Sequence, residues 1–408
     1  MGLCRPDSLQ RPMLVVLSMA DSEPHARSRE RHRQQRRRQV RRRRTVAGCV
    51  LLALAAGITL GARAVGGGHE SASKGTSAVA AASQNAPVHP RREVPDEIRG
   101  VHVTMGLASL PGKLDEYLAT PGLNAIELDV KDENGRVGFV PSSVPLARQT
   151  GAAAPYYKAK QVARQAHAHG AYLIGRIVTF EDPVLAEKRP DLAIRSSDGS
   201  IWHTNGGLAW TNPYDRRVWR YNVDLAAAAV KAGFDEIQFD YVRFPSDGDI
   251  SLIRYPGTHT QSMRWTIPAF VQYAGKRLHP LGARVSVDVF GLSANRDLGI
   301  GQLPRRVSRY VDAVYPMVYP SHFSSGEYGI SDPNAAPGET VTRSLQDFQR
   351  ALEGRKARLT PWLQDFSLGR TYDEEDVLAQ VAAARGLHTR GFLLWNPEGL
   401  YTTPVLQP

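Results

Sequence analysis

The feature that most constrains the fold is a regular alternation of short β-like runs with amphipathic helical segments from residue 99 onward. Helical spacing recurs at 156–170, 216–233, 267–278, 303–311, 343–354 and 374–386. The runs expected as strands are 99–106, 124–131, 171–180, 235–244, 284–291, 311–320, 358–366 and 390–397. Repeated β–α units form parallel sheets, and eight of them favour an α/β fold of the closed (β/α)8 type, a TIM barrel. The rival open sheet would normally show a glycine-rich phosphate turn after its first strand, and HVTMGLASLPG is not one.

The positive charge of the chain is concentrated before this region. The formal net charge is +11, and the thirteen arginines of residues 1–44 give that segment +9, which leaves +2 for the rest. A nucleic-acid-binding domain would be expected to carry basic clusters within its fold, so no nucleic-acid partner is expected. Cys4 and Cys49 also precede the barrel, so it contains no disulfide and no thiolate nucleophile.

An apolar run of 18 residues, 45–62, follows four consecutive arginines. Its length just reaches that of a membrane-spanning helix, and the basic flank predicts that the C-terminal domain lies outside the cytoplasm. Ala64 ends a small-x-small triplet, so the alternative is a signal peptide cleaved there and a secreted barrel. The expected parts are a basic cytoplasmic tail (1–44), a single-pass signal anchor in the cell membrane (45–64), a flexible linker (65–96) and the barrel (97–402).

Several predicted strands alternate apolar side chains with charged or amide ones. Ile237 and Phe239 alternate with Glu236, Gln238 and Asp240. Successive side chains of a strand point to opposite faces, so the apolar set would meet the helices and the polar set would face the barrel interior. The same reasoning places inward the residues Glu127, Asp129, Lys131, Arg284, Ser286 and Asp288.

Buried acids on three strands indicate a functional purpose. An unpaired buried carboxylate costs several kcal/mol or shifts its pKa strongly. The last inward acid of each strand, Asp129, Asp240 or Asp288, should lie near the C-terminal mouth, where barrel enzymes hold their active sites.

Paired carboxylates surrounded by Trp and Tyr suit glycoside cleavage. One acid protonates the departing oxygen, and the other attacks the anomeric carbon or activates water. The catalytic candidates are Asp240, Asp288 and Asp129. The candidates for substrate contacts are Lys131, Arg176, Tyr241, Arg243, Tyr315, Tyr319, Trp362, Gln364, Trp395 and Glu398.

Structural alternatives stay open for these residues. Asp240 could pair with Arg243 in a packed barrel, and Asp129 with Lys131 could belong to a charge network at its centre. Trp362, Trp395, Tyr315 and Tyr319 could be core residues. Metal catalysis lacks its ligands, because His102 and His322 are the histidines near strand ends and no His-x-His lies at the end of a predicted strand. No cofactor or metal is therefore expected.

The motifs DVKDENG (129–135) and FDYVRFP (239–245), with GRIVTFEDP and LLWNPEG, resemble a glycoside hydrolase family of bacterial TIM barrels. The resemblance extends over roughly residues 97–402. It implies a carbohydrate substrate and makes Asp240, at the end of the fourth strand, the leading catalytic carboxylate. By analogy with better-known glycosidase barrels, Asp288 on the fifth strand is its partner, with Asp129 and Glu398 in reserve. Many of those enzymes carry Glu where this chain has Asp.

Together these features predict a membrane-tethered glycoside hydrolase that acts on a cell-envelope or extracellular polysaccharide. Asp240 would be the nucleophile or base and Asp288 the general acid. One alternative is a non-catalytic carbohydrate-binding barrel tethered to the envelope. Another is a different acid/base enzyme, such as a lyase or a metal-assisted deacetylase.

Overall fold

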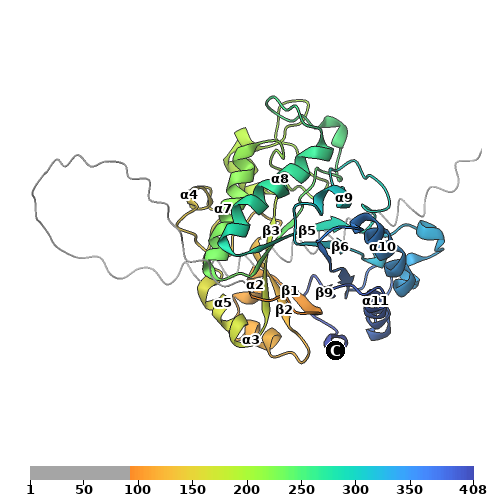
Figure 1. Cartoon of the computed structure of the whole chain (residues 1–408). Helices are drawn as coiled ribbons and strands as arrows, with labels where there is room; N and C mark the ends of the chain where they lie inside the picture. The colour runs from red at the N-terminus through yellow and green to blue at the C-terminus, as the bar shows by residue number, and fades with distance from the viewer. Residues whose placement is uncertain (1–91) are drawn as a thin grey trace, which may run out of the picture. The chain divides into compact units, whose positions relative to one another are not determined.

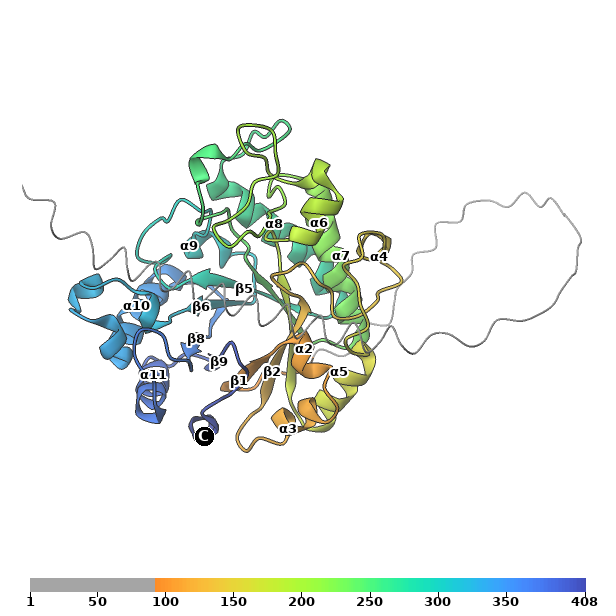
Figure 2. The same cartoon turned by 180° about the vertical axis from the view of Figure 1, so that it is seen from behind.

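The computed structural model describes residues 92–408, in which parallel strands close on themselves and helices surround them (Figures 1 and 2). The strands are β1 (Ile98–Val103), β2 (Ala125–Lys131), β3 (Tyr172–Val178), β4 (Glu236–Asp240), β5 (Arg284–Phe290), β6 (Ala313–Met317), β7 (Arg358–Leu359), β8 (Trp362–Gln364) and β9 (Gly391–Trp395). Pairing of β1 with β9 and of β5 with β6 closes the sheet. The predicted (β/α)8 barrel is confirmed.

The seventh barrel position holds two short strands. β7 and β8 both pair with β6, and β8 then pairs with β9. Thr360 and Pro361 separate them, and proline has no N–H to donate to a sheet ladder. The run predicted at 358–366 is therefore one strand of the barrel with a proline interruption.

Helices and loops connect successive strands on the outside of the barrel. The helices are α2 (Met105–Ala108), α3 (Lys113–Leu118), α4 (Pro145–Gln149), α5 (Ala159–Ala168), α6 (Pro183–Lys188), α7 (Arg216–Ala232), α8 (Met263–Leu278), α9 (Pro304–Val307), α10 (Pro337–Leu352) and α11 (Glu374–Gly386). The loops contain the 3-10 turns η1 (Pro190–Leu192), η2 (Ile250–Leu252), η3 (His279–Leu281), η4 (Pro320–His322), η5 (Glu327–Gly329), η6 (Pro333–Ala335) and η7 (Thr403–Leu406). All six predicted helices are present, although the segment expected at 303–311 forms only the short α9.

The tail, the signal anchor and most of the linker expected from the sequence fall within 1–91, outside the described residues. Among residues 92–408, none of the helices combines the length and apolar character that a bilayer crossing requires.

The barrel has an apolar layer on each side of its strands. Outward residues such as Ile237, Phe239 and Val287 pack beneath the helices, as the alternation predicted. Inside the barrel, Tyr172, Ile174 and Leu393 belong to a second apolar cluster.

An ion pair holds one oxygen of the lowest acid of β4. Glu236 Oε2 accepts hydrogen bonds from Tyr172 Oη at 2.9 Å and from Arg358 Nη2 at 2.7 Å. Not every inward acid therefore serves chemistry.

The long loop after β3 (181–213) and the loop after β4 (241–262) are joined by hydrogen bonds beyond the strand ends. Trp202 Nε1 donates to the Asp249 carbonyl at 2.9 Å, and Asn212 Nδ2 donates to the Pro256 carbonyl at 3.0 Å. Backbone bonds between Arg195 and Arg254 add to this contact. The two loops therefore form one rim beside the barrel mouth.

Gly391 at the start of β9 provides a test of barrel closure. Its φ of +90° disfavours any side chain, and a Cβ there would collide with the backbone of Ile98 on β1. We expect Gly391→Ala to lower the free energy of unfolding by about 3 kcal/mol or more, measured by denaturant unfolding. Gly386→Ala is the matched control, because a Cβ at that helical position meets nothing within 4 Å and should not destabilise the fold. Equal stability of the two variants would contradict this account of closure.

Candidate active site

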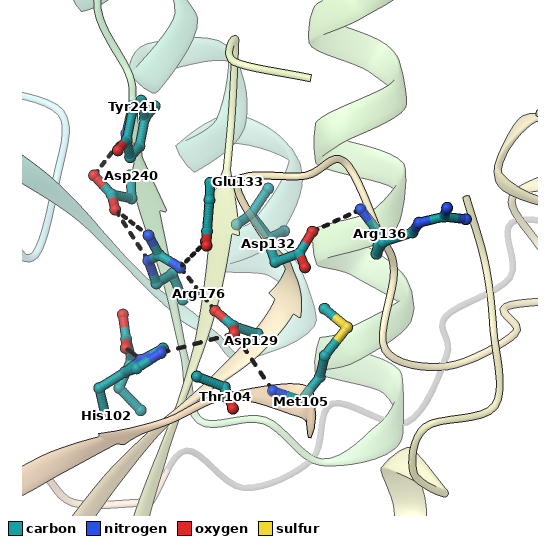
Figure 3. A network of polar contacts seen from close by, with 12 residues as sticks. His102, Thr104, Met105, Asp129, Asp132, Glu133, Arg136, Arg176, Asp240 and Tyr241 are labelled. Carbon is teal, nitrogen blue, oxygen red and sulfur yellow. Dashed lines mark hydrogen bonds and ion pairs between the residues drawn. The ribbon is translucent and has the colours of Figure 1, made fainter. Parts of the chain in front are cut away.

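Arg176 joins the acids at the top of β2 and β4 (Figure 3). Its Nε and Nη2 donate to Asp240 Oδ2 at 3.0 and 2.7 Å, and its Nη1 donates to Asp129 Oδ1 at 2.8 Å. Glu133 Oε2 lies 3.6 Å from Nη1. Burial lowers the pKa of Arg176, but Asp240 and Asp129 raise it by more, so the net pKa lies well above its ordinary value. A permanently charged guanidinium thus holds two buried carboxylates side by side.

A histidine continues this network below Asp129. His102 Nε2 lies 3.7 Å from Asp129 Oδ2, and its Nδ1 forms a short contact with Glu127 Oε2. Burial lowers the pKa of His102, but Asp129 and Glu127 raise it by more, so the net pKa is raised. The indole of Trp395 lies over the imidazole, with ring centroids 4.5 Å apart. His102 therefore positions Asp129 from beneath the mouth.

Asp240 is the last residue of β4, and a residue with a strained backbone follows it. Its Oδ1 accepts the backbone N–H of Tyr241 at 2.7 Å, while Oδ2 accepts from Arg176. Tyr241 has a φ of +47°, a region that non-glycine residues rarely adopt and that costs about 1–3 kcal/mol. Both Asp240 oxygens thus act as hydrogen-bond acceptors.

Asp288 on β5 has a different environment. Trp362 Nε1 donates to its Oδ1 at 2.7 Å, and Gln238 Nε2 donates to the same oxygen. Burial and the neighbouring carboxylates of Asp240 and Glu127 raise the pKa of Asp288 well above its ordinary value. Oδ2 is left as the oxygen that can carry a proton.

Asp240 and Asp288 line one cavity of about 390 Å³ at the mouth. Half of the residues that line this cavity were predicted from the sequence as catalytic or substrate-contact residues. The full lining is Arg176, Asp240, Tyr241, Asp288, Phe290, Gly291, Leu292, Leu298, Met317, Tyr319, His322, Phe323, Trp362 and Trp395.

Arg243 lies behind the cavity wall. Its guanidinium carbon is 5.0 Å from the Tyr241 ring centroid and 4.8 Å from that of Phe290. Its Nη1 donates to the Phe244 carbonyl and to Ser246 Oγ, both at 3.1 Å. The ion pair that the sequence left open for Asp240 is therefore made by Arg176.

Two predicted contact residues lie away from the cavity for reasons of strand geometry. A register shift between Asp129 and Lys131 turns Lys131 out of the barrel, where its Nζ pairs with Asp182 Oδ2 at 2.6 Å and lies 5.4 Å from the Tyr221 ring centroid. The expectation of an inward Lys131 is therefore corrected. Tyr315 does point inward, but lower down, in the apolar cluster with Tyr172.

Two further predicted contacts serve the local backbone. Gln364 is fully buried; its Oε1 accepts Ser321 N–H at 3.0 Å and its Nε2 donates to the Phe366 carbonyl. Glu398 is exposed on the turn after β9, where its N–H donates to Asn396 Oδ1. Neither residue lines the cavity.

Glu181, just after β3, was not singled out by the sequence pattern as a site residue. It is 5% exposed, and its Oε2 accepts a hydrogen bond from Trp210 Nε1 at 3.0 Å. Burial raises the pKa of Glu181 to about 7, although Arg243 and Trp210 oppose the shift. It lies in the quoted motif GRIVTFEDP, but outside any strand, so alternation gave no signal for it.

Fold and site together define a glycosidase-type barrel, with two differently held aspartates and an aromatic wall in one cavity at the strand ends. Residues 100–401 match the family described as "Putative glycosyl hydrolase domain", and the chain belongs to that family. This places it among the glycosidases. No curated protein matches the chain.

Several solved structures are similar. A hypothetical protein from Ruminiclostridium thermocellum is 35% identical over 46% of this chain and 97% of its own, with a TM-score of 0.43. The PgaB (BpsB) glycoside hydrolase domain from Bordetella bronchiseptica is 14% identical over 76% of this chain and 99% of its own, with a TM-score of 0.51, which shows the shared fold. An α-galactosidase from Thermus thermophilus is 16% identical over 78% of this chain and 63% of its own, with a TM-score of 0.47.

Lys131 tests whether the outward ion pair is structural. Lys131→Met leaves Asp182 buried without its cation, so we expect a loss of about 3–5 kcal/mol in the free energy of unfolding. The exposed Lys160 on α5 supplies the control, Lys160→Met, with little change expected. A stable Lys131→Met variant with a raised KM would instead restore the sequence-based prediction of a substrate contact.

Glu181 gives the stability a pH dependence. The pKa of Glu181 is higher in the folded state than in the unfolded state, where it is about 4.3. The stability that Glu181 contributes is therefore complete below about pH 4.3 and is lost as the pH rises through about 7. Glu181→Gln should therefore gain stability relative to the wild type between pH 4.5 and pH 8, by roughly 3 kcal/mol, in urea titrations. Glu187 is exposed, so the stability of Glu187→Gln should change with pH in the same way as that of the wild type. A parallel Glu181→Gln curve would contradict the assignment.

Proposed function

We propose that the barrel hydrolyses a glycosidic bond of a cell-envelope or extracellular polysaccharide, with Asp240 as nucleophile or base and Asp288 as general acid. The observation that carries the proposal is that two carboxyl groups of one cavity have opposite surroundings. Asp240 accepts hydrogen bonds on both oxygens from a guanidinium and a backbone N–H. Asp288 is buried near other carboxylates, which favours its protonated form. Environments that separate two acids in this way support a division into acid and base.

The remaining polar groups would support these two roles. Arg176 would orient Asp240, and Asp129 would hold Arg176 from the other side. Trp362 would orient Asp288 through its indole N–H and, with Trp395 and Tyr319, would offer apolar faces to sugar C–H groups. The cycle needs no group beyond these side chains and water.

The course of the reaction would follow from the bonds that change. The Asp288 proton would pass to the glycosidic oxygen as the bond from that oxygen to the anomeric carbon breaks. Asp240 would either bond to the anomeric carbon or take a proton from the attacking water. In both cases Asp288 leaves the first step as a carboxylate.

We further propose that 45–64 tethers the barrel on the outer side of the cell membrane. The support is the uncharged run directly behind four arginines. Fractionation with N-terminal sequencing of the mature protein tests it. An intact N-terminus in the membrane fraction supports the anchor, whereas cleavage near Ala64 supports secretion.

Substitution of either aspartate tests the catalytic assignment. We expect Asp240→Asn and Asp288→Asn to lower kcat by about 10³-fold or more on a glycan that the full-length chain hydrolyses, measured as released reducing ends. Asp198→Asn, at an exposed loop aspartate, is the control and should retain activity. If both site variants bind glycan and no polysaccharide is cleaved by the wild type at any pH, the barrel is a carbohydrate-binding module instead.

The two roles also predict different responses to the leaving group and to pH. An aryl glycoside needs little help from an acid, so Asp288→Asn should recover much of its activity on such a substrate, while Asp240→Asn should not. The kcat/KM of the wild type should fall as pH rises through the raised pKa of Asp288. If the fall in kcat/KM at high pH is lost in Asp240→Asn but kept in Asp288→Asn, the roles of the two aspartates are reversed.

A further inference from the structure

The cavity has two chemically different halves. Its polar half is formed by Arg176, Asp240 and Asp288, on β3, β4 and β5. Its other half comes from the end of β5, the end of β6 and the loops that follow these strands. Tyr319 and His322 also line that half, and its wholly apolar side chains are Phe290, Leu292, Leu298, Met317 and Phe323, which we call the apolar wall.

The apolar wall is not simply an edge of the hydrophobic core. Phe290, Leu292 and Leu298 are partly buried, yet none of them belongs to the hydrophobic clusters found within 92–408. Their apolar surface faces the cavity. Partly exposed apolar side chains that line a pocket form a surface suited to the recognition of an apolar group.

The loop that carries the wall is fixed next to Asp288. Gln302 accepts the Phe290 N–H through its Oε1 and donates to the Asp288 carbonyl through its Nε2, both at 3.0 Å. Ser344 Oγ on α10 donates to the Gly291 carbonyl at 2.8 Å. The wall is therefore preformed, and it lies beside the acid assigned to the leaving group.

Sugar hydroxyls are poorly matched to this wall. Leu, Met and Phe side chains offer neither a hydrogen-bond donor nor a conventional acceptor to replace the lost water, so a hydroxyl held against them is left without a partner. An alkyl, acyl or aryl group in the same place gains free energy by leaving water. These five side chains thus disfavour a hydroxyl group that is placed against them.

We propose that the substrate is a glycoside carrying an apolar substituent next to the cleaved bond, and that Leu292, Leu298 and Phe290 select it. The identification of the ligand as a sugar rests on the proposed function. The substituent belongs to one chemical class, a small alkyl, acyl or aryl group, which the wall receives while the polar half holds the ring.

The experiment measures binding of non-hydrolysable probes to the wild-type full-length chain. Methyl and butyl thioglycosides of glucose, galactose and N-acetylglucosamine, in both anomeric forms, are titrated by calorimetry. The three added methylene groups of the butyl probe should tighten Kd by roughly 10-fold or more for the sugar that binds. A butyl probe that binds no tighter than its methyl counterpart, or a panel in which no probe binds, overturns the inference.

A matched pair of variants locates the selectivity. Leu298→Asn keeps the approximate size of the side chain but adds an amide, so the butyl-to-methyl ratio should fall to about one-fifth of its wild-type value or less. Leu110→Asn alters an exposed leucine outside the cavity and should leave that ratio unchanged. Leu292→Asn repeats the test if Leu298→Asn has a lowered melting temperature. A preserved ratio in both wall variants overturns the inference.

The two proposals fail separately. Selective binding of butyl probes with no cleavage of any polysaccharide overturns the hydrolase assignment and supports the apolar recognition. Cleavage of a glycan by a chain that does not distinguish butyl from methyl probes overturns the recognition and leaves the hydrolase assignment standing.

Discussion

The structure depends on the guanidinium of Arg176, which brings together carboxylates that would otherwise repel one another inside the barrel. Asp240 and Asp129 come from strands on either side of β3, and both are almost fully buried. Two buried carboxylates so close to each other repel strongly in the low dielectric of the barrel interior. Arg176 lies between them and donates hydrogen bonds to both, and the free energy of these ion pairs offsets much of the cost of desolvating the carboxylates.

The same arrangement separates the two acids of the cavity. Asp240 receives the positive charge, while Asp288 receives two neutral donors and the repulsion of nearby carboxylates. A single cavity thus contains one carboxyl group that is paired with a cation and another whose surroundings favour its protonated form. Chemistry that needs a proton donor and a nucleophile at the same bond is served by this difference.

Much of this architecture was readable in the sequence. Alternation with period two placed Glu236, Gln238, Asp240 and Asp288 inside the barrel, because a strand has no other way to present its side chains. The alternation predicted the wrong direction for Lys131, because a register shift at the end of β2 turns this side chain toward Asp182. The alternation could not identify Glu181, because this residue lies beyond β3 in a loop whose path depends on contacts with the loop after β4.

The sequence by itself determined the eight-unit barrel, the inward acids and the end of the barrel at which they gather, because these follow from local periodicity and chain direction. Only the tertiary structure decided which acid pairs with Arg176, which is left to carry a proton, and that Phe290, Leu292 and Leu298 form an apolar wall beside them. Those outcomes depend on distances between side chains from different strands and loops. Such distances are fixed when the barrel closes, and no local pattern contains them.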